Sequence, residues 1–150
     1  MTLANLLGKG LEKAETDARE VTRYLDKIGR KLEDARRTSN HLDTRFDIAF
    51  EALLQIAICA LRVNGYRTTT AAGHQQVAIQ LLPKSIGIDA GTIRVLDEYR
   101  KKRSLGLYQA DFDPSEQEVK AVIASVERLR TDLTAWIKKN RPELLKNNSA

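Results

Sequence analysis

Four consecutive cations, Arg100, Lys101, Lys102 and Arg103, are the residues of this sequence with the clearest chemical meaning. Adjacent like charges repel one another, so folding alone gives little reason to place them together. Cations near a helix C-terminus oppose the helix dipole, worth about 0.3–1 kcal/mol each, and basic residues keep a surface hydrated. These two effects explain one or two charges better than four. The cluster therefore favours a surface that binds an anion.

The residues that follow the cluster add to this interpretation. Ser104 leads through "LGL" to Tyr108. If the helix continues, Arg103 and Leu107 share a face, with Tyr108 close beside it. An arginine binds phosphate through two parallel hydrogen bonds, and a phenol ring stacks on a nucleic-acid base. Together, Arg103 and Tyr108 suggest contacts to a nucleotide or a nucleic acid.

Other candidate sites are weaker. His41, Cys59 and His74 lack the spacing of metal ligands, and Gly8–Gly10 lacks the strand and the full spacing of a phosphate-binding loop. His74, in "GHQQ", begins a short predicted helix, where it is either a partly exposed helix-start residue or a contact to a substrate or partner near the end of the fold. No nucleophile–histidine–acid set is readable. We expect no metal and no cofactor.

Length and composition predict a single helical domain. Three prolines and eight glycines in 150 residues leave long uninterrupted segments rich in Ala, Leu, Arg, Lys and Glu. The net charge of +5 favours an anionic partner only mildly. The longest apolar run, 52–61, is too short to cross a bilayer, and the first residues lack the features of a signal peptide. We therefore expect a cytoplasmic protein without a membrane partner.

Hydrophobic periodicity predicts the order of the helices. Apolar residues three and four positions apart predict a long first helix with one buried seam; these residues are Leu11, Ala14, Ala18, Val21, Leu25, Ile28, Leu32 and Ala35. A second, largely buried helix follows the polar break "TSNHLD" and ends near Asn64, where Gly65 takes the C-cap position.

The second half of the chain predicts three more helices and no strand. A short helix covers about 74–82, and another begins at Asp89 and ends in the basic cluster, followed by a loop through 104–112. Asp113 is the expected N-cap of the last helix, which Pro142 ends. The fold class is therefore all-α, an antiparallel up-and-down bundle of four to five helices, with one domain over 1–141 and a frayed tail over 142–150.

The order of several segments resembles the HEPN superfamily of small helical proteins. The similarity covers roughly residues 30 to 137 and includes "DTRFDIAFEALL" opening the second helix, the exit "NGY", the loop into "GHQQ" and an arginine–polar pair late in the chain. Members are four- or five-helix bundles, often dimers. Many are metal-independent ribonucleases, and several are toxins paired with a minimal nucleotidyltransferase antitoxin.

The resemblance implies a site on the segment that contains the cations. The motif of the superfamily is an arginine, a polar residue, three variable residues and a histidine, which places Arg103 and Ser104 at the first two positions and Tyr108 at the histidine. An imidazole exchanges protons near neutral pH, whereas an ordinary phenol has a pKa near 10 and is a poor general base there. The resemblance thus implies a catalytic set of Arg103, Ser104 and Tyr108 with a substituted proton carrier.

The leading function expected from the sequence is binding of RNA or a nucleotide, possibly within a toxin–antitoxin or defence system as the resemblance implies. Arg100, Lys101, Lys102, Arg103 and His74 are the expected contacts. One alternative is a metal-independent endoribonuclease that uses Arg103 with Tyr108. A second alternative is a protein-interaction module that partners a nucleotidyltransferase. The resemblance also implies a homodimer.

Overall fold

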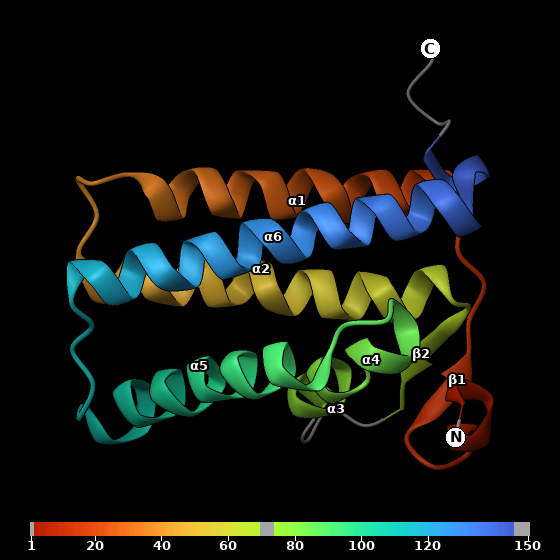
Figure 1. Cartoon of the computed structure of the whole chain (residues 1–150), viewed down its shortest axis with the longest axis horizontal. Helices are drawn as coiled ribbons and strands as arrows, with labels where there is room; N and C mark the ends of the chain where they lie inside the picture. Colours follow the sequence, from red (N-terminus) through yellow and green to blue (C-terminus); the bar gives the residue numbers. More distant parts are fainter. Residues whose placement is uncertain (1, 70–73, 146–150) are drawn as a thin grey trace.

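Four long α-helices make up most of the molecule, as Figure 1 shows. The computed structural model describes residues 2–69 and 74–145. The long helices are α1 (Ala18–Arg36), α2 (Leu42–Val63), α5 (Ala90–Gln109) and α6 (Glu116–Asn140). The short ones are α3 (His74–Gln80) and α4 (Leu82–Ser85), with 3-10 turns at Leu3–Leu6 (η1) and Pro142–Leu145 (η2). The predicted all-α bundle is confirmed.

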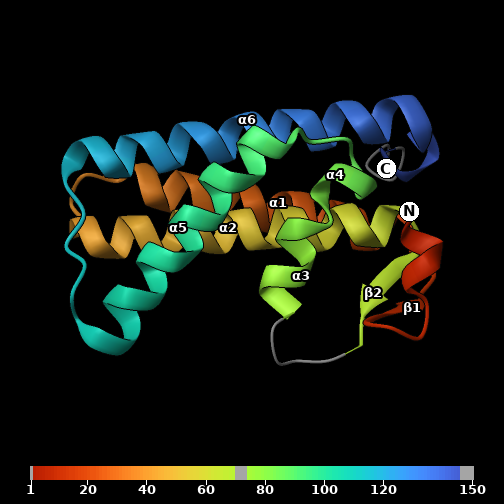
Figure 2. The same ribbon diagram turned by 60° about the horizontal axis from the view of Figure 1, so that its bottom comes forward.

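Helix α2 is the centre of the core. Its buried residues include Phe46, Phe50, Leu53 and Ile56, all at most 1% exposed. Helices α1 and α6 pack along it, whereas α5 crosses it at an angle and diverges from α6 toward its C-terminal end (Figure 2). The sequence predicted α2 as the most buried helix because apolar residues occupy most of its circumference.

The first helix is shorter than predicted. Val21, Ile28, Leu32 and Ala35 are buried, which confirms this part of the seam, but α1 begins at Ala18 with Asp17 as its N-cap. The Asp17 carboxylate accepts a hydrogen bond of 2.8 Å from the Glu20 amide. The prediction of a helix from Leu11 was therefore wrong, because this side chain is buried from a strand instead.

A small sheet occupies one end of the bundle. Strand β1 (Leu11–Lys13) pairs antiparallel with β2 (Tyr66–Thr68), with Leu11 opposite Thr68. Arg62, at the end of α2, holds the segment between β1 and α1 by donating to the Ala14 carbonyl at 2.8 Å and the Glu15 carbonyl at 2.7 Å. The expectation of no strand was wrong, because a strand of three residues is too short to show alternation.

Helix α5 is longer than predicted. It continues through 104–109, where the sequence suggested a loop, and ends at Ala110 in the left-handed conformation with φ 55°. One glycine within a helix costs only about 1 kcal/mol relative to alanine, so Gly106 does not end it. A Cβ atom at Gly106 would lie 3.4 Å from the Phe112 carbonyl oxygen, so the glycine also lets the following loop fold back closely.

The last helix begins at a different cap from the one predicted. Ser115, rather than Asp113, is the N-cap of α6. Its hydroxyl accepts from the Glu118 amide at 3.1 Å, and the Glu118 carboxylate accepts from the Ser115 amide at 3.1 Å. This reciprocal pair satisfies two helix-end donors, whereas Asp113 would satisfy one.

The chain stays in the core beyond the end of α6. Leu144 in η2 is 3% exposed, so part of the segment that the sequence assigned to a frayed tail belongs to the packed fold. The remainder of that tail, 146–150, lies outside the described residues. No helix among the described residues is long and apolar enough to span a membrane.

Candidate nucleic-acid interface

The predicted site residues from Arg100 to Tyr108 all lie on α5, but they point to different sides of it. Each residue of a helix is turned by about 100° from the one before. The inner side carries Leu96, Tyr99, Arg103 and Gly106, and we call it the inner stripe. The opposite side carries Arg94, Glu98, Lys101, Leu105 and Tyr108, and we call it the outer stripe.

Arg103 lies in the contact between α5 and α2. Its guanidinium carbon is 5.3 Å from the centre of the Phe50 ring, and its side chain is 24% exposed. The Nε atom is buried without a hydrogen-bond partner, 3.8 Å from the Asp47 carboxylate. This arginine therefore holds α5 against the core by packing over an aromatic ring.

Asp47 is the charged neighbour of Arg103. Burial raises the pKa of the Asp47 carboxyl above its ordinary value, and the nearby Arg103 guanidinium lowers it by less. At 3.8 Å the contact between the two side chains is too long for a hydrogen bond. The attraction between the charges thus does not offset the partial loss of water around the carboxylate.

Tyr108 has the opposite environment. Its side chain is 78% exposed, and it lies about 140° around α5 from Arg103, because five residues separate them. Ser104 is half-buried. The structure does not bring Arg103 and Tyr108 together on one face, so the two ends of the predicted catalytic set diverge within one chain.

Arg100 and Lys101 are paired with acids on their own helix. Arg100 donates to Asp97 at 2.8 Å, and Lys101 lies 3.6 Å from Glu98 and 3.8 Å from Asp97. Lys101 is still 57% exposed. The acids that precede the cluster thus neutralise much of the repulsion that made the cluster stand out in the sequence.

Lys102 connects α5 to α6. Its ammonium lies 3.2 Å from the Glu118 carboxylate and 6.0 Å from the centre of the Phe112 ring. The bond from Lys102, together with the backbone bond from Ser115, keeps the pKa of Glu118 below its ordinary value, the backbone bond being the larger cause. Lys102 therefore has a structural partner, and the predicted cluster is divided between structural contacts and solvent.

His74 is the remaining predicted contact. It begins α3, but its side chain lies outside the described residues. Its contact with a ligand stays a prediction. In the part of the chain that is described, no group of three His, Cys, Asp or Glu side chains could hold a metal ion. Burial raises the pKa of the Cys59 thiol to about 12, so this cysteine stays protonated.

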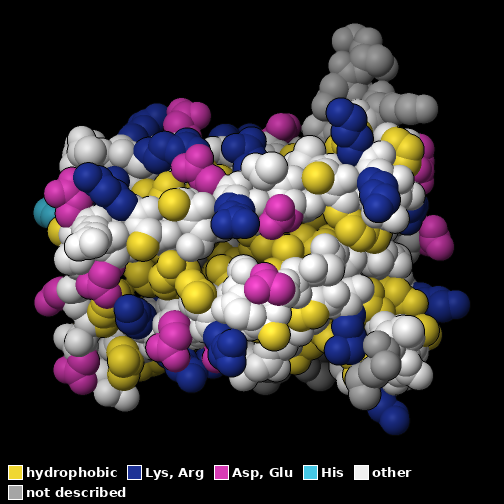
Figure 3. Space-filling model, viewed as in Figure 1, with side chains coloured by type: hydrophobic (Ala, Val, Ile, Leu, Met, Phe, Trp, Pro, Cys, Tyr) yellow, Lys and Arg dark blue, Asp and Glu magenta, His cyan; other side chains and the backbone are white. Residues whose placement is uncertain are grey.

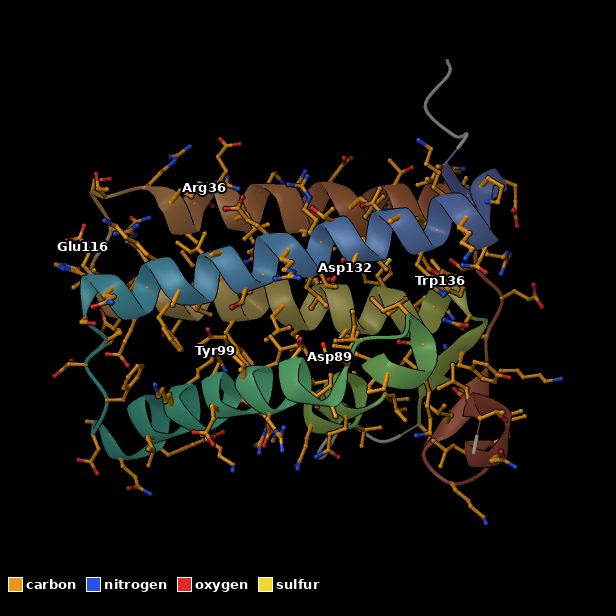
Figure 4. The ribbon with its side chains drawn as sticks, viewed as in Figure 1. Arg36, Asp89, Tyr99, Glu116, Asp132 and Trp136 are labelled. Carbon is orange, nitrogen blue, oxygen red and sulfur yellow. The ribbon has the colours of Figure 1, made fainter. Side chains whose placement is uncertain are left out.

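The sequence did not predict a groove between α5 and α6. The groove has a volume of about 690 Å³, and its walls include Asp89, Thr92, Leu96, Leu129, Asp132 and Trp136. Figure 4 shows Asp89 and Trp136 on opposite sides of the groove, and Figure 3 shows hydrophobic side chains along the furrow between the two helices. The groove exists because α5 diverges from α6, which residue spacing does not encode.

A bond between the two helices crosses this furrow. The Tyr99 hydroxyl lies 3.1 Å from the Ser125 hydroxyl, and the Tyr99 ring packs edge-on against Phe46 with 6.0 Å between the ring centres. Tyr99 therefore couples the position of α5 to both α2 and α6.

Comparison of the chain with protein-family models, with curated proteins and with solved structures finds no match.

Proposed function

We propose that this protein binds single-stranded nucleic acid through the outer stripe of α5. The observation that carries the proposal is the common side of Arg94, Lys101 and Tyr108, which are seven residues apart. All three side chains are exposed, Tyr108 by 78% and Lys101 by 57%. Seven residues span about 10.5 Å along a helix, so the stripe presents two cations and an aromatic ring in a row.

The chemistry of these side chains suits a nucleic-acid strand. A base stacked on an aromatic ring contributes about 1–3 kcal/mol without regard to sequence, and cations neutralise the phosphates. The carboxylates near Lys101 are 3.6 and 3.8 Å away. Exposed pairs of this kind contribute about 0–1 kcal/mol, so a phosphate replaces them at little cost. The resemblance to the HEPN superfamily supports the same class of ligand.

A binding assay with a single-stranded RNA of about 20 nucleotides tests the role of Tyr108. Tyr108→Ala should weaken binding about 5- to 150-fold, the equivalent of 1–3 kcal/mol, while Tyr108→Phe keeps the ring and should retain most of the affinity. Leu107→Ala is the matched control, because Leu107 is the adjacent exposed residue but lies off the outer stripe. Equal affinities for Tyr108→Ala and the parent would contradict the proposal.

The same assay in EDTA separates binding from the ribonuclease alternative. Because Arg103 and Tyr108 lie on different sides of one α5, a shared catalytic site would require a second chain. Metal-independent cleavage that Tyr108→Phe abolishes would favour the ribonuclease. Retention of intact RNA favours binding.

A second candidate function, a protein-interaction module, is favoured by the exposed apolar residues at the end of α5. Leu105 is 42% exposed and Leu107 is 60% exposed. Exposed apolar residues near a basic helix are also found where a protein partner binds. A small nucleotidyltransferase encoded next to this protein, and its co-purification with the parent but not with Leu107→Glu, would support this candidate.

A further inference from the structure

The solvent face of α1 carries four cations in a row. Arg19, Arg23, Lys27 and Arg30 are separated by four, four and three residues, which places them on one side of the helix. We call them the basic stripe of α1. From the first to the last is a rise of about 16 Å. The row was not visible as a cluster in the sequence, because intervening residues hide a helical stripe.

The basic stripe differs from the rest of the surface because its charges are unpaired. Within the described residues, none of its four side chains has an ion pair or a hydrogen bond to a side chain. The other basic residues of this helix have partners: Lys31 pairs with Glu51, Arg36 with Glu127, and Arg37 with Glu33 and Asp34. The repulsion along the stripe is therefore uncompensated, and a bound anion would relieve it.

The acids near the stripe do not neutralise it. Glu20 accepts hydrogen bonds from Arg62 at 2.7 Å and from the Thr16 hydroxyl at 2.6 Å, so its charge is already engaged. Asp26 is the other acid near the stripe, and it lies more than 4 Å from any cation among the described residues. Four cations beside one free carboxylate leave a local excess of positive charge.

A groove lies beside these cations, between α1 and α2. It has a volume of about 460 Å³, with Arg23, Lys27 and Arg30 along one wall and Tyr24, Gln55 and Ile58 completing it. Tyr24 and Ile58 are half-buried and pack against the core. The groove thus combines cations for phosphates with a ring, an amide and an apolar surface for a base or a sugar.

We propose that this groove, the α1 groove, binds the phosphate backbone of a single-stranded nucleic acid, as a site separate from the outer stripe of α5. The concave shape favours a strand over a membrane surface. A helix that lies on a membrane directs apolar side chains outward, whereas the apolar side of α1 (Val21, Ile28, Leu32) is buried in the core.

Two triple variants of equal charge test the proposal. Arg23→Gln/Lys27→Gln/Arg30→Gln removes the cations of the α1 groove. Lys31→Gln/Arg36→Gln/Arg37→Gln removes one lysine and two arginines from the same helix, all of them paired. The affinity for an RNA of about 20 nucleotides is measured from about 50 to 200 mM salt. Thermal denaturation shows that both variants fold.

The groove variant should change the salt dependence and the control should not. For single strands, the slope of log affinity against log salt falls by about 0.7 for each phosphate contact removed, so three contacts reduce it by about 2. Equal slopes and affinities in the two variants overturn the proposal.

Further arms distinguish the other outcomes. Loss of RNA binding in Tyr108→Ala but not in the groove variant overturns the α1 groove and leaves the α5 proposal intact; the reverse pattern leaves only the α1 groove. Vesicles with anionic phospholipid and polyglutamate serve as competing probes. If either binds the parent more tightly than RNA does, and the groove variant abolishes that binding, the assignment to nucleic acid is overturned.

Discussion

At the scale of single residues, the side of α5 decides what a charge does. Arg103 is placed over Phe50 and Asp47, where it joins two helices, while Lys101, only two residues earlier, is directed into solvent. Both have the charge of the predicted cluster. A basic residue on the inner stripe contributes to packing, and one on the outer stripe is available to a ligand.

The contact between Arg103 and Asp47 gives a prediction about pH. Because the fold raises the pKa of Asp47, the folded chain holds this proton more tightly than the unfolded chain, and stability is lost as the pH rises through that pKa. Asp47→Asn removes this loss. The variant should be at least as stable as the parent at pH 7, and the difference should vanish below about pH 4 in thermal denaturation.

Asp43→Asn is the control for this measurement. Asp43 lies in the first turn of the same helix, where a negative charge is favourable, and its carboxylate accepts from the Thr44 amide at 2.9 Å. Its replacement should lower stability by about 0.3–1 kcal/mol. A parent that is more stable than Asp47→Asn at pH 7 would show instead that the attraction of Arg103 exceeds the cost of burial.

The residues of the candidate site were found from the sequence, but their arrangement was not. Four adjacent cations and Tyr108 are visible in the printed sequence, and so is their place on one helix. The pairing of Lys102 with Glu118 joins residues 16 apart in the chain, and that of Arg103 with Asp47 joins residues farther apart still. Contacts between helices depend on the angle at which the helices cross, which the spacing of apolar residues does not fix.

At the scale of elements, helix ends were the least predictable feature. The core faces of α1, α2 and α6 were read correctly, because a period of 3.6 residues over many turns leaves a strong signal. The start of α1 and the start of α6 were misplaced. At each of these ends several polar residues compete to be the cap, as in "DPSE", where Asp113 and Ser115 are both suitable.

The cap of α6 gives a prediction with its own control. Ser115→Ala removes the hydroxyl that accepts from the Glu118 amide and should lower the free energy of unfolding by about 1 kcal/mol. Asp113→Ala, two residues earlier, should have little effect, because the structure assigns the cap to Ser115. Urea denaturation compares the two variants with the parent. A larger loss for Asp113→Ala would restore the cap that the sequence suggested.

At the scale of the whole molecule, the faces of the bundle differ in chemistry. The furrow between α5 and α6 has an apolar floor with acids and bases at its rim, and the α1 groove is lined mainly by unpaired cations. The net charge of +5 is therefore distributed unevenly, because the basic cluster of α5 is paired and the basic stripe of α1 is not. Total charge indicates an anionic partner, but only the fold shows which cations are free to bind it.

The resemblance to the HEPN superfamily leads us to expect a homodimer, and α5 offers a place to test it. A stable interface buries about 800 Å² of each partner, roughly a tenth of a small protein's surface; the accessible surface here is 8713 Å². Leu107 is the most exposed leucine of α5 and lies off the outer stripe, so a contact through it leaves Lys101 and Tyr108 accessible.

Sedimentation equilibrium measures the expected association. The parent should sediment as a dimer that dissociates on dilution, and Leu107→Lys should shift it toward the monomer, because a charge at the centre of an apolar contact loses its water. Val95→Lys is the matched control: Val95 is 46% exposed on the same helix but lies at the α5–α6 furrow. A parent that remains a monomer at every concentration would remove the homodimer. A dimer that Val95→Lys disrupts and Leu107→Lys does not would move the interface from the end of α5 to the furrow.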